Sequence, residues 1–203
     1  MVQSLVPYPA NLSVDYPDRE LDKLTTAFRI FTVIPIAIIL GMLSSGDSRS
    51  GAAIAGLVFV PTALMIVFRQ KYPRWWYDWN MAILNFSIRV SAYFALLRDE
   101  YPSTDEEQAV HIAIPYPDAM NGLNRWLPLV KWFLAIPHYI VLFFLGIAAF
   151  FVVIVAWFAI LFTGRYPRSL FDFVVGTYRW YVRVLAYAVI LTTDEYPPFR
   201  MAP

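Results

Sequence analysis

Residues 127–163, LPLVKWFLAIPHYIVLFFLGIAAFFVVIVAWFAILFT, decide how this chain is built. A single cation, Lys131, lies near the start of this stretch, and His138 follows a proline. After the histidine no residue of the stretch is charged, and nearly all are aliphatic or aromatic. A hydrocarbon core about 30 Å thick needs roughly 20 apolar residues of helix to cross it. A run of this length and composition indicates a membrane protein.

The stretch is too long for one crossing and suits two short spans, at about 127–145 and 147–163, with a turn near Gly146. The first half of the chain has two further apolar segments, at about 24–43 and 52–70. A loop of Ser, Gly and Asp residues separates them, which is typical of a connection between helices. We therefore expect four spans in two helical hairpins.

The composition supports this class of protein. The chain has 203 residues, of which 59% are hydrophobic and only 15% are charged, against roughly 25% charged in soluble domains. The net charge of +1 gives no global field that points to nucleic acid as a partner. The absence of cysteine excludes disulfides, thiolate metal sites and cysteine nucleophiles within this chain. Residues 1–11 lack the charged and apolar regions of a signal peptide.

Two segments, at about 75–97 and 169–191, mix apolar, aromatic and charged residues. Such helices fit a position in the plane of the membrane interface better than a crossing of the hydrocarbon core. If they cross instead, the chain has six spans, and this alternative stays open. The aromatic residues expected to anchor the chain at the interface are Trp75, Trp76, Tyr72 and Tyr166.

The second half of the chain resembles the first. Ten residues recur 94 positions later in one ungapped register, including charged residues and prolines, which indicates a duplication. In the first half they are Phe68, Tyr72, Pro73, Arg74, Asp78, Arg89, Val90, Ala92, Tyr93 and Leu97. The expected domains are a first repeat at residues 1–110 and a second repeat at residues 111–203. With two crossings each, they form parallel repeats related by an axis along the membrane normal.

The cations predict the orientation of the spans. Two crossings per half place most of the Lys and Arg residues on the side of the Tyr-Pro pairs, and only Arg49 on the other side. Cytoplasmic loops carry the excess of Lys and Arg. We therefore expect both termini in the cytoplasm.

A Gly-Arg-Tyr-Pro-Arg motif at residues 164–168 and an Ile-Pro-His step at residues 136–138 carry a family resemblance. With the apolar hairpin and the helix that follows, the chain resembles a bacterial membrane family catalogued as domain of unknown function 4389 (DUF4389). The resemblance implies a multi-pass protein of the bacterial inner membrane and brings no known activity. The first half departs from the pattern, with Ile36 in place of His138 and Gln70 in place of Gly164.

The basic residues on the expected cytoplasmic rim are candidates for binding anionic lipid headgroups or a partner protein. They are Arg74, Arg89, Arg168, Arg183 and Lys131, together with His138. Two of them, Arg74 and Arg168, precede an aspartate by four residues, which favours a structural pair on one helix face. The other two arginines are three turns from the same aspartates, too far for a direct bond.

His138 is the single residue with the most distinctive chemistry. Haem in membrane proteins usually takes two facing histidines, and metals take several ligands. His111 is the only other histidine of the chain, so we expect no haem, other cofactor or metal. A histidine bonded to a carbonyl freed by Pro137 is the simpler interpretation.

The sequence predicts no enzyme, since phosphate-binding loops, nucleophile elbows and zinc-protease motifs are absent. The first functional hypothesis is a non-catalytic accessory or scaffolding subunit that packs against lipid, other membrane proteins or itself. Small residues such as Gly41, Gly146 and Ala149 allow close helix contact. A second hypothesis is a small transporter or lipid-handling protein with a cavity between the repeats, near Arg29, Lys131 and His138. A haem-binding membrane subunit is the third.

Overall fold

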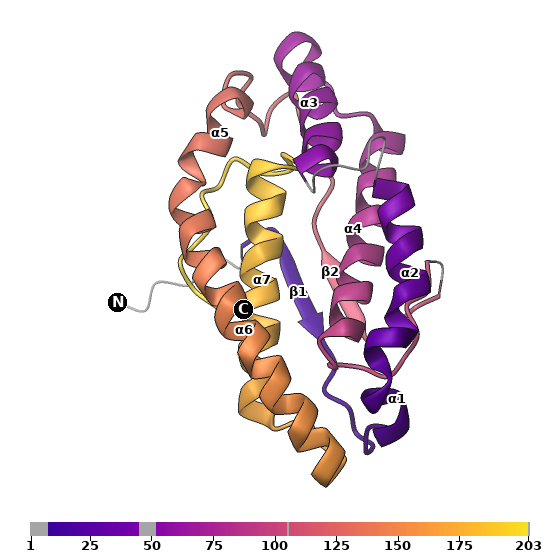
Figure 1. The fold of residues 1–203 in the computed structure, drawn as a ribbon. Coiled ribbons are helices and arrows are strands. Elements are labelled where there is room, and N and C mark those ends of the chain that lie inside the picture. Colours follow the sequence, from indigo (N-terminus) through magenta and orange to yellow (C-terminus); the bar gives the residue numbers. More distant parts are fainter. Residues whose placement is uncertain (1–7, 45–51, 105, 203) are drawn as a thin grey trace.

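In a computed structural model that describes residues 8–44, 52–104 and 106–202, the chain is mostly helical (Figure 1). The described residues form seven helices and a pair of short strands. In chain order they are β1 (Asn11–Val14), α1 (Lys23–Ala27), α2 (Arg29–Ser44), α3 (Ala52–Arg69), α4 (Arg74–Phe94), β2 (Val110–Ala113), α5 (Pro128–Leu134), α6 (Ile136–Thr163) and α7 (Arg168–Ala188).

The two strands correct the expectation of an all-α fold. β1 and β2 pair antiparallel, with Leu12 opposite Ile112 and Ser13 opposite His111. Alternate residues of β1 are buried, as expected for a strand with one face on a core. Each strand has four residues, and the partners are about 100 residues apart in the chain. Pairing over such a distance leaves no local pattern in the sequence that distinguishes these segments from polar connectors.

α4 and α7 confirm the two predicted mixed helices to within a few residues. Each begins directly after a proline, Pro73 or Pro167, whose backbone is extended and which has no amide N–H to offer to the helix. α7 packs against both β1 and α6, and it contributes a dozen buried residues to the core. It is therefore the central helix of the fold.

α6 corrects the predicted hairpin. It is one helix of 28 residues, and it passes through Gly146 without a turn. A helical hairpin needs a loop of about 2–5 residues between its helices, whereas a single glycine inside a helix costs only about 1 kcal/mol relative to alanine. The helix ends at Gly164, which has a left-handed backbone with φ of 73°. The strongest apolar run of the sequence thus makes one long helix.

Four spans are not supported by this structure. Among the described residues, α6 alone is long and apolar enough to cross a membrane, and the apolar parts of α2 and α3 are shorter. α4 and α7, which the six-span alternative requires, do not pass the same test. Only 11% of the most apolar window of α6 is buried, unlike the core helix of a soluble protein. These features suggest, weakly, that the protein associates with a membrane.

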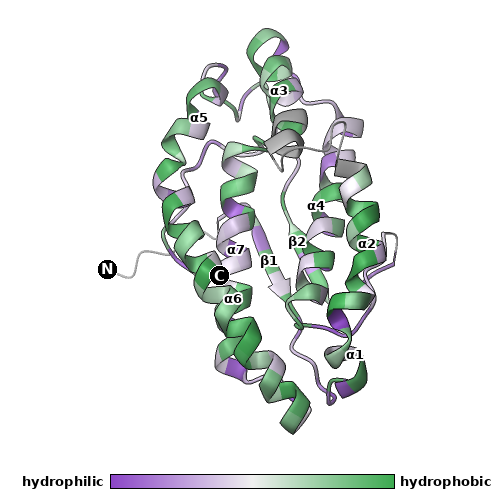
Figure 2. Cartoon of the chain, viewed as in Figure 1, coloured by the Kyte–Doolittle hydropathy of each residue, from purple (hydrophilic) through white to green (hydrophobic). Residues whose placement is uncertain are grey.

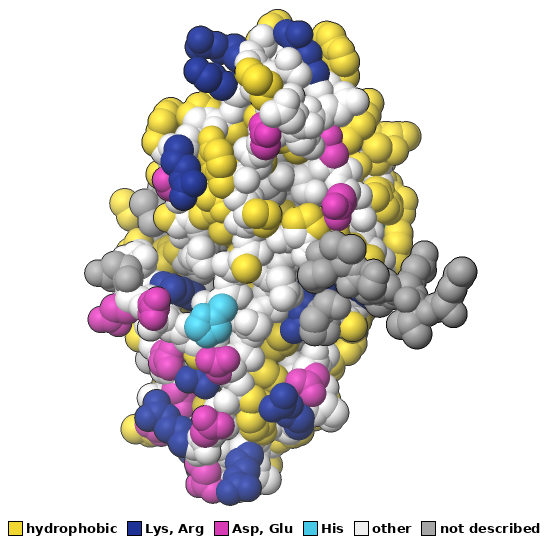
Figure 3. All heavy atoms as spheres, turned by 180° about the vertical axis from the view of Figure 1, so that it is seen from behind, with side chains coloured by type: hydrophobic (Ala, Val, Ile, Leu, Met, Phe, Trp, Pro, Cys, Tyr) yellow, Lys and Arg dark blue, Asp and Glu magenta, His cyan; other side chains and the backbone are white. Residues whose placement is uncertain are grey.

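The parallel arrangement of the two halves is also not observed. Figure 1 shows α2 rising from α1, whereas α6 descends from α5, so these two helices run in opposite directions. The most hydrophobic colours in Figure 2 lie on α2, α3, α5 and α6. Seen from behind in Figure 3, acidic side chains and many of the basic ones gather over the middle and lower part of the molecule, further Lys and Arg side chains lie at the top, and apolar side chains lie mainly at its margins. The molecule thus has a charged face, with its apolar helices around it.

Candidate functional site

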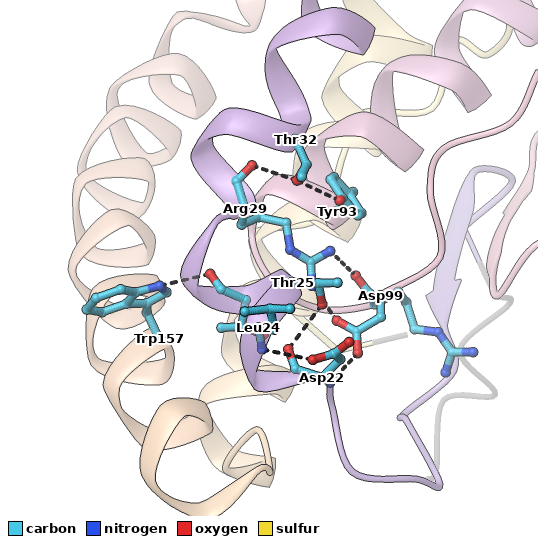
Figure 4. A network of polar contacts seen from close by, with 10 residues as sticks. Asp22, Leu24, Thr25, Arg29, Thr32, Tyr93, Asp99 and Trp157 are labelled. Carbon is cyan, nitrogen blue, oxygen red and sulfur yellow. Dashed lines mark hydrogen bonds and ion pairs between the residues drawn. The ribbon is translucent and has the colours of Figure 1, made fainter.

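A buried arginine begins α2 (Figure 4). The Arg29 side chain forms an ion pair with Asp99, and one guanidinium N–H donates to the backbone carbonyl of Arg98 over 3.0 Å. Its guanidinium carbon lies 4.1 Å from the ring centroid of Tyr93, which adds a cation–π contact. The other oxygen of the same aspartate accepts the backbone N–H of Asp22 over 2.8 Å. This pair ties the start of α2 to the segment after α4.

A second buried pair occupies the corresponding place in the second half. The Lys131 ammonium lies 2.6 Å from the Asp194 carboxylate and donates to the Thr193 carbonyl over 2.7 Å. Burial lowers the pKa of Lys131, and the aspartate opposes that shift. The same carboxylate accepts the backbone N–H of Asn124. Neither aspartate is among the site residues predicted from the sequence, although both begin an Asp-Glu-Tyr-Pro motif.

Two exposed arginines lie where the sequence places them. Arg74 bonds to the Asp78 carboxylate over 3.1 Å, and Arg168 contacts Asp172 at 3.3 Å, which confirms the two helical pairs four residues apart. Both arginine side chains are about two thirds exposed. Each guanidinium also lies over a tyrosine ring from the other half, at 5.0 Å from Tyr116 and 4.6 Å from Tyr16 respectively. These two cations remain accessible to an anion.

Arg89 and Arg183 do not bond to those aspartates, as their spacing predicts. Arg89 donates to the carbonyl of Ser103 over 2.8 Å. Arg183 is 1% exposed and donates to the carbonyls of Arg200 and Ala202 over 3.1 and 2.7 Å. Burial lowers its pKa to about 10. This side chain therefore holds the C-terminal segment from within the fold instead of reaching a headgroup.

His138 lies in an aromatic cluster at the start of α6 and is completely buried. The indole N–H of Trp180 donates to its Nδ1 over 3.0 Å, and the Phe199 ring stacks on it with centroids 4.0 Å apart. The expected bond to a freed carbonyl is thus replaced by a bond from an indole. Nε2 has no hydrogen-bond partner among the described residues. The other histidine, His111, lies on β2 and pairs with Asp15, so the two do not face each other across one site.

The four expected interface anchors divide into two pairs. Trp75 is 69% exposed, and Trp76 donates its indole N–H to Thr62 over 2.8 Å. Tyr72 and Tyr166 are buried. The Tyr72 carbonyl accepts the hydroxyl of Tyr116, which follows β2, and the Tyr166 carbonyl accepts that of Tyr16, which follows β1. The two tryptophans can anchor at an interface, whereas the two tyrosines stabilise the interior.

A cleft of about 540 Å³ lies between the start of α2, the end of α4, and the middle parts of α6 and α7. Gly146, Ala149 and Phe150 form its α6 wall, and all but three of its lining side chains are apolar. One edge is closed by the Trp157 indole, which donates to the Thr26 carbonyl over 3.0 Å (Figure 4). Small-molecule sites in proteins are clefts of about this size with mostly apolar walls.

Among the residues that the structure describes, Arg29 is the only charged one that lines this cleft. Two of its nitrogens are occupied by Asp99 and the Arg98 carbonyl, but its buried Nε has no hydrogen-bond partner among the described residues. A buried donor without a partner is uncommon in native proteins. The second hypothesis places a cavity near this arginine, and one is found there, while neither Lys131 nor His138 lines it. In the described part of the chain, no group of three or more His, Cys, Asp and Glu side chains lies close enough to hold a metal.

The fold and these contacts define a largely helical protein with one long exposed apolar helix, two buried cation–carboxylate pairs and an apolar cleft. Residues 126–200 match the family described as Domain of unknown function (DUF4389). This match confirms the resemblance seen in the sequence, so the chain carries a DUF4389 domain over α5, α6 and α7. No curated protein and no solved structure matches the chain.

Proposed function

We propose that this protein is a non-catalytic, membrane-associated protein that binds one hydrocarbon chain of a membrane lipid in the cleft between α2, α4, α6 and α7. The observation that carries the proposal is the cleft itself, with its apolar walls and one arginine. Each CH₂ group that leaves water for such a site contributes about 0.8 kcal/mol. A site of this kind favours an unbranched apolar chain over a polar substrate.

The position of the cleft supports a lipid over a water-borne ligand. Phe150 and Ile30, on opposite walls, are 57% and 66% exposed. Both belong to the apolar surfaces that would face a membrane. A lipid chain can therefore enter from the bilayer without crossing water.

Gly146 provides the test. A Cβ built on this glycine has no atom within 4 Å, so a larger side chain fits without strain and fills part of the cleft. We expect Gly146→Leu to lose bound lipid in native mass spectrometry of protein extracted from membranes in mild detergent. Gly41→Leu is the matched control, because this glycine also has an open Cβ position but lies outside the cleft. Equal lipid content in the two variants and the parent protein would contradict the proposal.

A partner protein is the second candidate, since Gly146 and Ala149 are small residues of the kind that let another helix approach closely. In that case the protein acts as an accessory or scaffolding subunit. Gly146→Leu would then release a co-purifying protein and leave the lipid content unchanged. The inner-membrane location and the multi-pass topology with cytoplasmic termini stay predictions from the sequence.

We also infer that the two halves arose by duplication. Beyond the sequence repeats, this is supported by three pairs of equivalent contacts. Arg29–Asp99 corresponds to Lys131–Asp194. The hydroxyl of Tyr16 donates to the Tyr166 carbonyl as that of Tyr116 donates to the Tyr72 carbonyl. The guanidinium of Arg168 covers the Tyr16 ring as that of Arg74 covers the Tyr116 ring.

A further inference from the structure

The exposed face of α6 is an unbroken apolar stripe. Six phenylalanines on it are at least half exposed: Phe143, Phe144, Phe150, Phe151, Phe158 and Phe162. Between Ile140 and the last of these, no exposed residue of the helix is polar. At 1.5 Å per residue, the 28-residue helix is about 42 Å long. Protein interfaces carry about one hydrogen bond per 100–200 Å², so a stripe without polar groups fits hydrocarbon better than a protein partner.

The β1–β2 sheet, which packs against α7 as α6 does, has a polar surface. On the two-stranded sheet, the His111 and Asp15 side chains are 58% and 63% exposed and lie 3.3 Å apart. Asn11 and Ser13 are also exposed there. With only two strands, the outer edge of each strand has no partner strand in the sheet. Such a surface belongs in water, because hydrocarbon offers nothing to exposed strand edges or charged side chains.

α7 fixes the position of the sheet relative to α6. Arg179, near the middle of α7, donates its Nε–H to the Leu12 carbonyl of β1 over 2.9 Å. The preceding residue, Tyr178, lines the cleft together with Ala149 and Phe150 from the middle of α6. The residue after Arg179, Trp180, packs in one cluster with Leu142 and Leu145 from the first half of α6. The polar sheet therefore lies beside the first half and the centre of the apolar helix, within the length that a crossing helix would place in hydrocarbon. If α6 crossed a bilayer, the sheet would be drawn into the hydrocarbon core.

From this arrangement we propose that α6 does not cross the membrane but lies in the plane of one leaflet, with its phenylalanine stripe toward the acyl chains and the β1–β2 sheet in water. The partner of this surface is a single lipid leaflet. The start of α2 joins the same surface, since Ile30 and Phe150 flank the cleft and are both exposed. Trp126, just before α5, and Trp132, on α5, are 63% and 53% exposed and provide the aromatic residues that favour a headgroup boundary. An amphipathic unit lying in the interface satisfies both faces at once.

This inference rests on the membrane association that is part of the proposed function. The test is therefore chosen so that the in-plane position of α6 can fail while lipid binding in the cleft stands. The chain has no cysteine, which makes single-cysteine variants straightforward. Trp126→Cys places a thiol just before α5, which leads into α6, and Arg165→Cys places one just after α6, both at exposed side chains. Ser13→Cys places one on the water-facing side of the sheet. Each full-length variant is reconstituted in sealed vesicles of phosphatidylethanolamine and phosphatidylglycerol with one known orientation and treated with a membrane-impermeant maleimide.

An in-plane helix predicts that all three thiols react from the same side. Labelling of the two helix ends from opposite sides would overturn the in-plane position and leave the lipid cleft intact. Nitroxide labels at Phe144, Phe151 and Phe158, each seven residues apart, give a second measurement. Equal depth at all three supports the proposal, whereas a depth that increases steadily along the helix or peaks at one label contradicts it. Failure of the unlabelled protein to float with vesicles would remove both this inference and the proposed function.

Discussion

The two halves of the molecule contain the same kind of apolar stretch, but the stretch folds differently in each. In the first half it is divided between α2 and α3, whereas in the second half it is the single helix α6. Pro61 lies inside α3 and Pro35 inside α2, but the only proline of α6 is at its first turn. A proline in a helix interior removes a hydrogen bond and favours a kink. The division itself falls at the Ser- and Gly-rich residues 45–51, which have no counterpart in α6, so only the second half forms one long helix.

The two halves have similar buried ion pairs, although their apolar helices differ. Each half pairs a buried cation at the start of its apolar stretch with an aspartate that follows the mixed helix. The chemistry of the cation differs, since one half uses arginine and the other uses lysine. This difference gives the largest expected effect, because only the lysine can lose its proton when its partner is removed.

Asp99→Asn leaves the Arg29 guanidinium buried without its counterion. Removing one partner of a buried pair typically costs about 3–5 kcal/mol, and both side chains of this pair are nearly inaccessible, at 3% and 11% exposed. We expect a loss of that order in the free energy of unfolding in detergent, with little dependence on pH between 7 and 9.5. Denaturation curves at the two pH values measure it.

Asp194→Asn should cost less and depend on pH. Burial already lowers the pKa of Lys131, and loss of the opposing carboxylate lowers it further. In the pH range between that lowered pKa and the ordinary value of about 10.4, the unfolded chain binds more protons than the folded one, so stability rises with pH. The variant should therefore regain part of its loss between pH 7 and 9.5. A loss that is independent of pH would show that the lysine keeps its proton in the fold.

A second comparison between the two halves concerns two pairs of packed core residues. His138 and Trp180 in the second half stand where Ile36 and Phe86 pack in the first. Trp180→Phe leaves the buried Nδ1 without its donor, which costs about 1–3 kcal/mol. His138→Ile leaves the indole N–H unpaired, with a cost of similar size. The double variant copies the first half and should be more stable than the sum of the two single losses predicts.

A double-mutant cycle of unfolding free energies isolates this coupling. A coupling free energy near zero would mean that the indole–imidazole hydrogen bond contributes nothing to stability. The ring contacts with Phe199 would then hold the histidine instead. Ile36→Ala in the first half is the control, since it removes apolar contacts without affecting a hydrogen bond.

The sequence predicts the local elements of this fold better than their assembly. The starts of α4 and α7 follow from Tyr-Pro steps, and the i,i+4 pairs at Arg74 and Arg168 follow from helical geometry. The β1–β2 pair could not be predicted, because four-residue strands about 100 residues apart stabilise each other only after the helices bring them together. The burial of Arg183 follows from the C-terminal carbonyls that it binds, and no local pattern reveals them.

The predicted helical hairpin, which the structure replaces with the single helix α6, is the error with the largest consequence. Hydropathy gives the same signal for one long helix and for two short helices joined tightly at a glycine. The length of the run and its resemblance to the two apolar segments of the first half both favour the hairpin. The lipid-handling hypothesis stays a prediction: the cleft borders Arg29, whereas Lys131 and His138 bond to other residues within the core. The repeated Asp-Glu-Tyr-Pro motif is the signal that could identify the acidic partner of each cation, since a buried cation needs a counterion.

The smallest expected effect lies at the ends of the apolar stretches, where Gln70 and Gly164 precede the two Tyr-Pro pairs. Both residues have a left-handed backbone, with φ of 46° and 73°. This conformation costs a residue with a side chain roughly 1–2 kcal/mol and costs glycine almost nothing. Gln70→Gly should therefore stabilise the protein by up to about 1 kcal/mol, because the greater freedom of glycine in the unfolded chain offsets part of the gain. Gly164→Ala should destabilise it by about 1–2 kcal/mol, and here a new Cβ would also lie 3.3 Å from the Glu20 carboxylate. Thermal unfolding of both variants beside the parent protein measures the pair. If the two substitutions shift the midpoint in the same direction, backbone strain at these positions is not what distinguishes the two helix ends, and the Glu20 contact alone accounts for the glycine.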